Sequence, residues 1–223
     1  MKVLELIVSF PIAIGIALIL ISCSPTKDTT NAKQSSFEGK IIYDLVMEDR
    51  TRTMTKEQAK MFKGNEQTYF IKDNKYKSVT NGMMKITQIY LGQDTLYNQV
   101  TGMNNLLWMN TTSNPNKLID FNIQKDVATV AGIKCDLLTI NLEGGTTKYY
   151  FNSKYYINPD NFKNHEYGFW KFCIEKTNSI PLKSITDTKD LYLEITAKKI
   201  IPMNINESEF KLPNLPRLES PEK

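Results

Sequence analysis

The stretch FEGKIIYDLVME, residues 37–48, carries the clearest strand pattern in the chain. Its alternate positions place Phe37, Gly39, Ile41, Tyr43 and Leu45 on one side. A period of two in apolar residues predicts a β-strand with one buried face. Because the residues before it are polar, we expect the folded domain to begin at residue 37.

Further extended runs follow, separated by turn residues. They cover residues 67–72, 76–80, 83–91, 95–100, 106–112, 117–123, 127–142, 146–157 and 191–205. Asn81-Gly82 between two of these runs predicts a tight hairpin, since both residues tolerate positive φ. The spacing of Thr55 and Gln58 is that of a capping box and predicts a helix over residues 54–62. Residues 158–186 predict a loop with a short helix that lies across the sheet.

An apolar segment precedes the domain and ends at a cysteine. It is too short to cross a bilayer comfortably and has the build of a secretory signal peptide. Its last residues, Leu20-Ile21-Ser22-Cys23, resemble the bacterial lipobox, which implies a signal peptide over residues 1–22 and lipidation of Cys23. The alternative is an ordinary signal peptide or membrane anchor that ends in cysteine. Residues 23–36 are polar and predict an unfolded tether.

Length and charge limit what the mature chain can be. About 200 residues remain after cleavage, which suits one domain, and we expect it over residues 37–213 with a loose tail at 214–223. The formal net charge of +4 is spread along the chain, which argues against a nucleic-acid partner.

Two cysteines remain besides Cys23. An even number of thiols in an exported protein favours a disulfide between Cys135 and Cys173. The alternative is two unpaired cysteines that pack as small apolar side chains.

The sequence shows no pattern typical of catalysis. It has one histidine, His165, so a site of several imidazoles within one chain is excluded. Asp160, His165 and Glu166 are close in sequence and could bind a metal, but a solvated loop explains them better. We therefore expect no catalytic residues, no metal, no cofactor and no enzymatic activity.

The order of these segments is similar to that of a known group. The strand FEGKIIYDL, the phrase VAGIKCDLLTI and the late INESEFKLP resemble envelope lipoproteins related to the outer-membrane lipoprotein carrier and receptor (Lol) proteins. Residues 131–135 also resemble a phrase of the neighbouring GLPGLI group, although the GLPGLI hexapeptide itself is missing. The resemblance implies an α+β fold: a strongly curved antiparallel β-sheet, or half-barrel, with short covering helices and an apolar cavity between them.

Two functions compete at this point. The first is a lipid-anchored protein that binds or carries an apolar ligand, such as a lipid or acyl chain. The strands at 83–91 and 106–112 have apolar residues on both faces, and we expect Met84, Tyr90 and Trp108 to border a cavity of several hundred Å³. The second is a structural or interaction component of an envelope assembly, with a protein partner and no small ligand. In both cases we expect the protein in the cell envelope, anchored by lipid to the periplasmic face of the outer membrane, because Ser24 follows the anchor.

Overall fold

The computed structural model describes residues 34–220, which form one compact unit. The predicted signal peptide, Cys23 and most of the predicted tether lie outside these residues. The strands are β1 (Gly39–Asp49), β2 (Glu66–Lys72), β3 (Lys75–Thr80), β4 (Ile86–Tyr90), β5 (Thr95–Val100), β6 (Leu106–Asn110), β7 (Leu118–Val130), β8 (Ile133–Leu142), β9 (Gly145–Phe151), β10 (Lys183–Thr188), β11 (Leu191–Pro202) and β12 (Arg217–Glu219). The helices are α1 (Lys56–Lys63), α2 (Trp170–Thr177) and the 3-10 turns η1 (Ser153–Tyr155), η2 (Pro159–Phe162), η3 (Tyr167–Phe169) and η4 (Glu207–Phe210).

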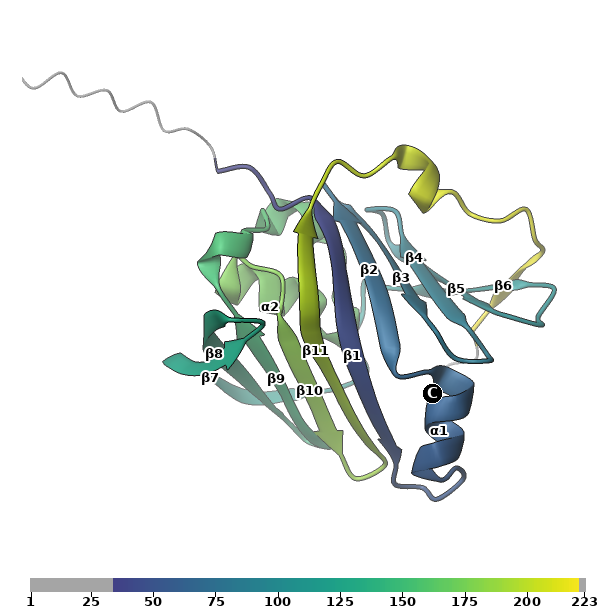
Figure 1. Ribbon diagram of the computed structural model, residues 1–223, viewed down its shortest axis with the longest axis horizontal. Coiled ribbons are helices and arrows are strands. Elements are labelled where there is room, and N and C mark those ends of the chain that lie inside the picture. Colours follow the sequence, from purple (N-terminus) through teal and green to yellow (C-terminus); the bar gives the residue numbers. More distant parts are fainter. Residues whose placement is uncertain (1–33, 221–223) are drawn as a thin grey trace, which may run out of the picture. The chain divides into compact units, whose positions relative to one another are not determined.

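These strands form a single sheet in the order β12-β6-β5-β4-β3-β2-β1-β11-β10-β9-β8-β7 (Figure 1). Neighbouring strands are antiparallel except for β12, which runs parallel to β6. The sheet is open, with β12 and β7 as its edges. The expectation of a strongly curved antiparallel half-barrel is therefore wrong. The sheet is wide and mixed, because the chain returns after β11 and adds its last strand beside β6.

The stretch that opens the domain forms a strand near the middle of this sheet. β1 pairs with β2 on one side and with β11 on the other. Ile41, Tyr43 and Leu45 are buried, as the alternation in residues 37–48 predicts. The predicted strand is confirmed. Its first half, residues 39–44, pairs with β2 and β11 at the same time.

Local signals also place the first helix. Thr55 accepts a hydrogen bond from the backbone N–H of Gln58, and the Gln58 side chain accepts one from the backbone N–H of Thr55. The predicted capping box is thus confirmed, and α1 begins at Lys56.

The hairpin predicted at Asn81-Gly82 is formed, since β3 and β4 pair antiparallel, but its tight two-residue turn is not. Neither residue has a positive φ. The Asn81 side chain instead accepts hydrogen bonds from the backbone N–H groups of Asn65 and Glu66. Residues 81–85 therefore form a longer connection that packs against the end of α1, because side-chain bonding to that segment replaces the tight turn.

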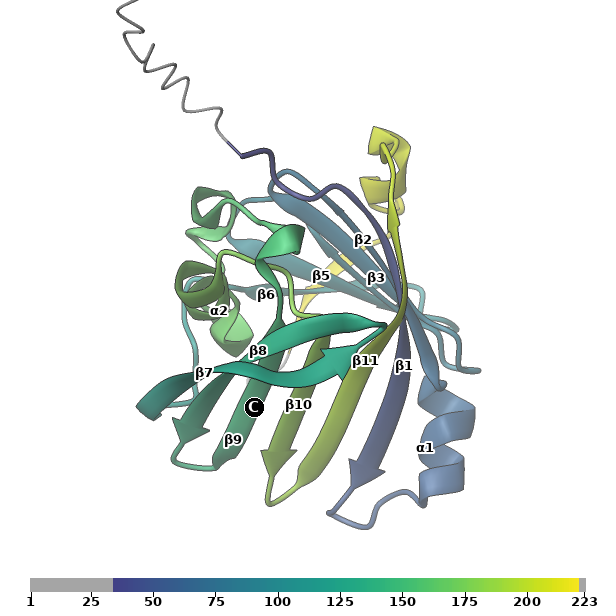
Figure 2. The ribbon, with the colours of Figure 1, turned by 60° about the vertical axis from the view of Figure 1, so that its left-hand side comes forward.

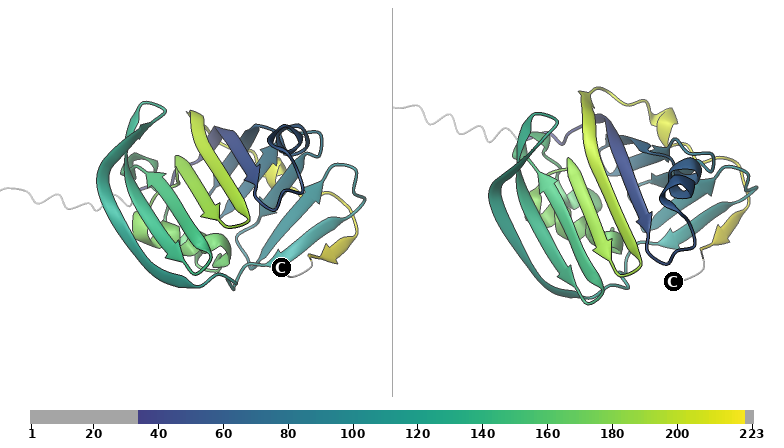
Figure 3. Two further views of the ribbon diagram at one scale, coloured as in Figure 1. Left: turned by 90° about the horizontal axis from the view of Figure 1, so that it is seen from below. Right: turned by 60° about the horizontal axis from the view of Figure 1, so that its bottom comes forward.

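The segment between β9 and β10 lies on one face of the sheet (Figures 2 and 3). It contains η1, η2, η3 and α2, so the expected short helix across the sheet is confirmed. Its main hydrophobic cluster packs Phe162, Ile174 and Ile180 against Ile41 and Ile71 of the strands. The part of residues 158–186 that we expected to be loop also contains the start of β10.

The C-terminal segment covers part of the opposite face. Alternation along β3 places Lys75 and Lys77 on that face, where they pair with Glu207 and Glu209 at 2.7 and 3.2 Å. The chain then reaches the edge of the sheet, where β12 forms. Part of the tail that we expected to be loose is therefore ordered, because backbone pairing with β6 satisfies its polar groups.

Candidate functional site

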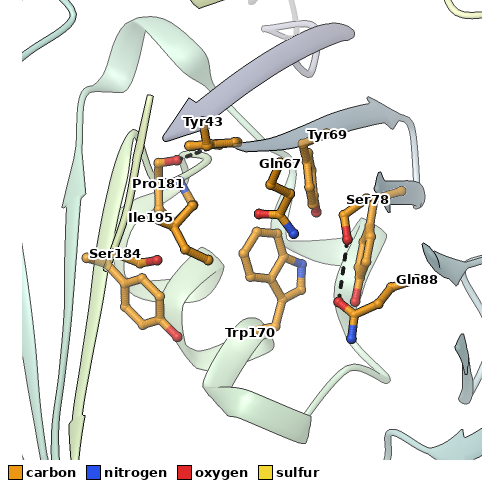
Figure 4. A pocket seen from close by; sticks show the side chains of 11 residues that line it. Tyr43, Gln67, Tyr69, Ser78, Gln88, Trp170, Pro181, Ser184 and Ile195 are labelled. Atoms are coloured by element: carbon orange, nitrogen blue, oxygen red, sulfur yellow. Dashed lines mark hydrogen bonds between the residues drawn. The ribbon is translucent and has the colours of Figure 1, made fainter. Parts of the chain in front are cut away.

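A pocket of about 180 Å³ lies between the sheet and the first residue of α2 (Figure 4). Strands β9, β10, β11, β1, β2, β3 and β4, which are consecutive in the sheet, contribute to its wall. The lining residues are Tyr43, Gln67, Tyr69, Tyr76, Ser78, Gln88, Tyr149, Trp170, Pro181, Ser184 and Ile195.

Strand register places the polar lining residues beside one another. Ser78 of β3 pairs with Tyr69 of β2 and with Gln88 of β4. Directly paired residues in adjacent antiparallel strands share a face of the sheet and lie close together. These three side chains therefore form one row on the face that α2 covers.

A second row lies on the other side of β1. Ser184 of β10 pairs with Tyr149 of β9 and with Ile195 of β11. Pro181, just before β10, borders the same side of the pocket. Figure 4 shows Pro181, Ser184 and Ile195 on one side and Ser78 and Gln88 on the other, with the Trp170 indole between them.

A sharp turn places Trp170 at the pocket. Gly168 and Phe169 both have left-handed backbone conformations, with φ of 64° and 58°. Glycine adopts this conformation freely, whereas for a bulky residue such as Phe169 the left-handed conformation costs roughly 1–3 kcal/mol of stability. The Tyr149 hydroxyl donates a 3.0 Å hydrogen bond to the Gly168 carbonyl, which ties the turn to β9.

The same segment is held to the end of β6. The backbone N–H groups of Glu166 and Tyr167 both donate to the Thr111 carbonyl, at 2.7 and 3.0 Å. The Thr111 hydroxyl donates to the Asn164 carbonyl at 3.1 Å. Trp170 therefore extends from a segment that backbone hydrogen bonds fix to the sheet.

Stacked aromatic rings form much of the wall. The rings of Tyr69 and Tyr76 are stacked with centroids 5.3 Å apart. The Trp170 ring lies 6.4 Å from Tyr69 and 5.9 Å from Tyr76, and Tyr43 meets Tyr69 edge-on at 6.3 Å. These distances are typical of favourable aromatic pairs, so the rings stabilise one another and the wall is mostly apolar.

Several polar groups in the wall have unused hydrogen-bonding capacity. Trp170 Nε1 is buried and has no hydrogen-bond partner among the described residues. The Ser78 hydroxyl lies 3.5 Å from Gln88 Oε1, the upper limit for a hydrogen bond. A buried donor without a partner costs about 1–3 kcal/mol. The pocket thus contains hydrogen-bonding groups that the described part of the fold does not satisfy.

The pocket is electrically neutral. Its lining contains no Lys, Arg, His, Asp or Glu. Burial raises the pKa of the Tyr43, Tyr69, Tyr76 and Tyr149 hydroxyls above that of an exposed tyrosine. These phenols therefore keep their protons at neutral pH.

The single histidine lies behind this wall. His165 Nε2 is 2.8 Å from the Tyr76 hydroxyl, and Nδ1 is buried without a partner among residues 34–220. Burial lowers the pKa of His165 to about 4, so its ring is neutral at pH 7. His165 supports Tyr76 and is not itself part of the lining.

A second, open groove of about 560 Å³ lies on the opposite face of the sheet. Lys77, Lys85 and Lys211 border it together with apolar residues of β3, β4 and the C-terminal segment. Lys77 is already paired with Glu209. The groove is a solvated gap between the sheet and the C-terminal segment that crosses it.

None of the three predicted ligand-binding residues lines the pocket or the groove. Met84 is 40% exposed in the connection before β4. Tyr90 is fully buried, and its hydroxyl donates to the Gln93 carbonyl at 2.5 Å. Trp108 is half-buried in β6, opposite Tyr97. Tyr90 stacks on Tyr76 at 5.5 Å and is thereby a core residue one ring away from the pocket.

The expected Cys135–Cys173 bridge is not formed. Both residues are free and buried. Cys135 belongs to the main hydrophobic cluster, whereas Cys173 packs in a separate cluster with Leu138 and Ile140. Each thiol fills a different part of the core, which is the alternative that the sequence left open. Cys23 lies outside the described residues.

Sequence reasoning missed most of the pocket, although a signal for it is present. Gln67, Ser78 and Gln88 are polar residues at positions where alternation predicts the buried face. Polar side chains on a buried face are uncommon unless they have partners or a function. That irregularity in β2, β3 and β4 is the pattern that could have indicated a binding site.

Comparisons with known proteins do not assign the chain to a family. No protein-family model matches it, and no curated protein matches it. The crystal structure of LprF from Mycobacterium bovis is similar over 76% of this chain and 88% of that chain, with 6% sequence identity and a TM-score of 0.32. We infer neither fold nor function from so distant a likeness. The expected relation to the Lol-like and GLPGLI groups is thus not supported.

None of the helices within residues 34–220 is both long and apolar enough to cross a membrane. In the same part of the chain, no three His, Cys, Asp or Glu side chains gather as a metal site.

Proposed function

We propose that this protein is a lipid-anchored lipoprotein of the cell envelope that binds the apolar part of a small ligand in the pocket beneath Trp170. The proposal rests on one observation. The pocket over the middle strands of the sheet is lined largely by aromatic rings and by no charged side chain. Binding sites for small molecules are typically concave and mostly apolar, with a few placed polar groups.

The volume limits what can enter. Sites for whole drug-sized ligands usually measure about 300–1,000 Å³, whereas an apolar cavity of about 150 Å³ holds one benzene molecule. A pocket of about 180 Å³ is therefore suited to one ring or the end of one acyl chain. A complete lipid would extend out of it.

We propose binding without catalysis. A hydrolytic or transfer site needs a nucleophile beside a base, or an acid and a base within hydrogen-bond reach of the substrate. The two serines of the lining, Ser78 and Ser184, have no imidazole, carboxylate or amine beside them in the wall. Bound ligand would therefore leave unchanged.

The two tryptophans of the chain make binding directly measurable. Full-length protein in lipid nanodiscs is titrated with 1-hexanol in two variants. Trp108→Phe keeps only the pocket residue Trp170 as a fluorophore, and Trp170→Phe keeps only Trp108. We expect a saturable change in emission in the first variant and none in the second. A linear response of equal size in both would reject the pocket as a binding site.

The anchor is tested separately by intact-mass measurement. Protein from a bacterial host that processes lipoproteins should begin at Cys23 and carry the added mass of acyl chains. More than one chain is needed for firm attachment, since a single chain binds membranes only marginally. Recovery of the whole chain with unmodified Cys23 would contradict the lipoprotein assignment and leave the pocket proposal intact.

A further inference from the structure

The two sides of the pocket differ in chemistry. One side presents Pro181, Ile195 and the ring of Tyr149, with the Ser184 hydroxyl as its small polar group. The other side presents Gln67, Ser78 and Gln88, with the Trp170 indole between the two sides (Figure 4). An apolar ligand alone would leave the second side unsatisfied.

Several of the unsatisfied groups are donors. Trp170 Nε1 can only donate a hydrogen bond, and it has no partner in the described part of the chain. The carboxamide NH₂ groups of Gln67 and Gln88 also make no hydrogen bond to another described residue, since the contact recorded for Gln88 uses Oε1. A ligand that brings an acceptor, such as a carbonyl oxygen, would satisfy these donors.

A charge at this place is disfavoured. Burying an ionised group without a partner of opposite charge costs far more than burying an amide or hydroxyl that is hydrogen-bonded. The lining offers no cation to a carboxylate or phosphate and no anion to an amine. The phenols of the wall stay neutral, as described above.

We infer that the pocket selects uncharged amphiphiles: the apolar end lies against Pro181, Ile195 and Tyr149, and a carbonyl-type acceptor lies against Trp170 Nε1 and the amide of Gln88. The inference rests on the proposed function and specifies its ligand class. It distinguishes fatty amides, esters and similar neutral groups from free fatty acids, which are ionised at neutral pH.

The test uses hexanamide and hexanoate, which have the same chain length and nearly the same shape. Both are titrated at pH 7 into full-length Trp108→Phe protein in nanodiscs, with Trp170 emission as the signal. We expect hexanamide to bind at least about tenfold more tightly than hexanoate, because only hexanoate must bury a charge.

Two glutamine variants locate the polar end. Gln88→Leu removes the amide from the pocket wall, whereas Gln99→Leu makes the same change in the groove on the opposite face. We expect Gln88→Leu to weaken hexanamide binding roughly fivefold, the value of one hydrogen bond, and Gln99→Leu to leave it unchanged. Equal affinities in the two variants would overturn the inference.

The remaining outcomes separate the two proposals. Saturable binding of hexanoate that is as tight as that of hexanamide would overturn the selectivity and leave the proposed binding function standing. No response of Trp170 to either compound or to 1-hexanol would overturn both.

Discussion

The Tyr76 hydroxyl and His165 Nε2 lie 2.8 Å apart, although 89 positions separate the two residues in the chain. The contact joins β3 to the segment that carries α2. It is buried, and His165 is only 3% exposed. The Tyr76 ring, which forms part of the pocket wall, is therefore held by a buried histidine.

The burial of His165 predicts a loss of stability in mild acid. Burial lowers the pKa of His165 from its usual 6.5 to about 4 in the folded state. Between these two values the unfolded chain binds a proton that the folded chain does not, so the free energy of unfolding falls as pH decreases from about 6.5 to about 4. The histidine contributes a loss of up to about 3 kcal/mol.

The measurement is urea unfolding at pH 7 and at pH 4.5, for the wild type and for His165→Gln. Glutamine does not titrate, so the variant should lose less stability than the wild type between the two pH values, although its stability at pH 7 is lower. Since His165 is the single histidine, its NMR titration is unambiguous. A titration midpoint near 6.5 in the folded protein would contradict the prediction.

A buried hydrogen bond links β1 to the residues just before β10. The Tyr43 hydroxyl donates to the Pro181 carbonyl at 2.9 Å. Tyr43→Phe removes the donor and leaves the carbonyl without it, which should lower the free energy of unfolding by about 1–3 kcal/mol. Tyr156→Phe is the matched control, because the Tyr156 hydroxyl makes no hydrogen bond to another described residue. Equal loss in chemical denaturation of the two variants would show that the Tyr43 bond contributes nothing specific.

The two core cysteines should be unreactive in the folded protein and free in the unfolded one. Burial raises the pKa of both thiols, and the thiolate is the reactive form. With Cys23→Ala in place, we expect a chromogenic disulfide reagent to label neither Cys135 nor Cys173 promptly under native conditions. It should label both after denaturation without reductant. No labelling after denaturation would mean that the chain forms the bridge after all.

The strands that could be predicted from the sequence are those whose own residues carry the signal. β5 was predicted with its observed limits, and α1 begins where Thr55 and Gln58 place it. β10 was missed because all six of its residues are half-buried and no clear alternation marks it. It is a strand because β9 and β11 pair with it on both sides.

The pocket could not be predicted from local sequence patterns for the same reason. Trp170 lines one pocket with Gln67 and Ser78 because β1 pairs with β11, which brings strands from the start and the end of the chain together. No residue near Trp170 in sequence indicates that pairing. The apolar residues of β4 and β6 were correctly placed in strands, but the strand order decides which face receives a cavity, and that order is a long-range property.

A pair of glycines tests how tightly the connection after α1 is packed. Gly64 and Gly102 both have a φ of +91°, so a side chain is strained at either position. They differ in space: a Cβ at Gly64 would collide with the Asn81 side chain and the Gly82 backbone, whereas a Cβ at Gly102 meets nothing within 4 Å. A side chain at either glycine therefore strains the backbone, but only a side chain at Gly64 also causes a steric clash.

We expect Gly102→Ala to lower the free energy of unfolding by about 1 kcal/mol, the cost of a left-handed conformation for alanine. Gly64→Ala should lower it by about 2–4 kcal/mol, because the Asn81 side chain must also give up its place beside residues 65 and 66. Urea denaturation of both variants at one pH measures the difference directly. Equal losses would mean that residues 81–85 can move away from the end of α1 without cost, and that the Asn81 contact found in place of the expected tight turn does not hold the connection.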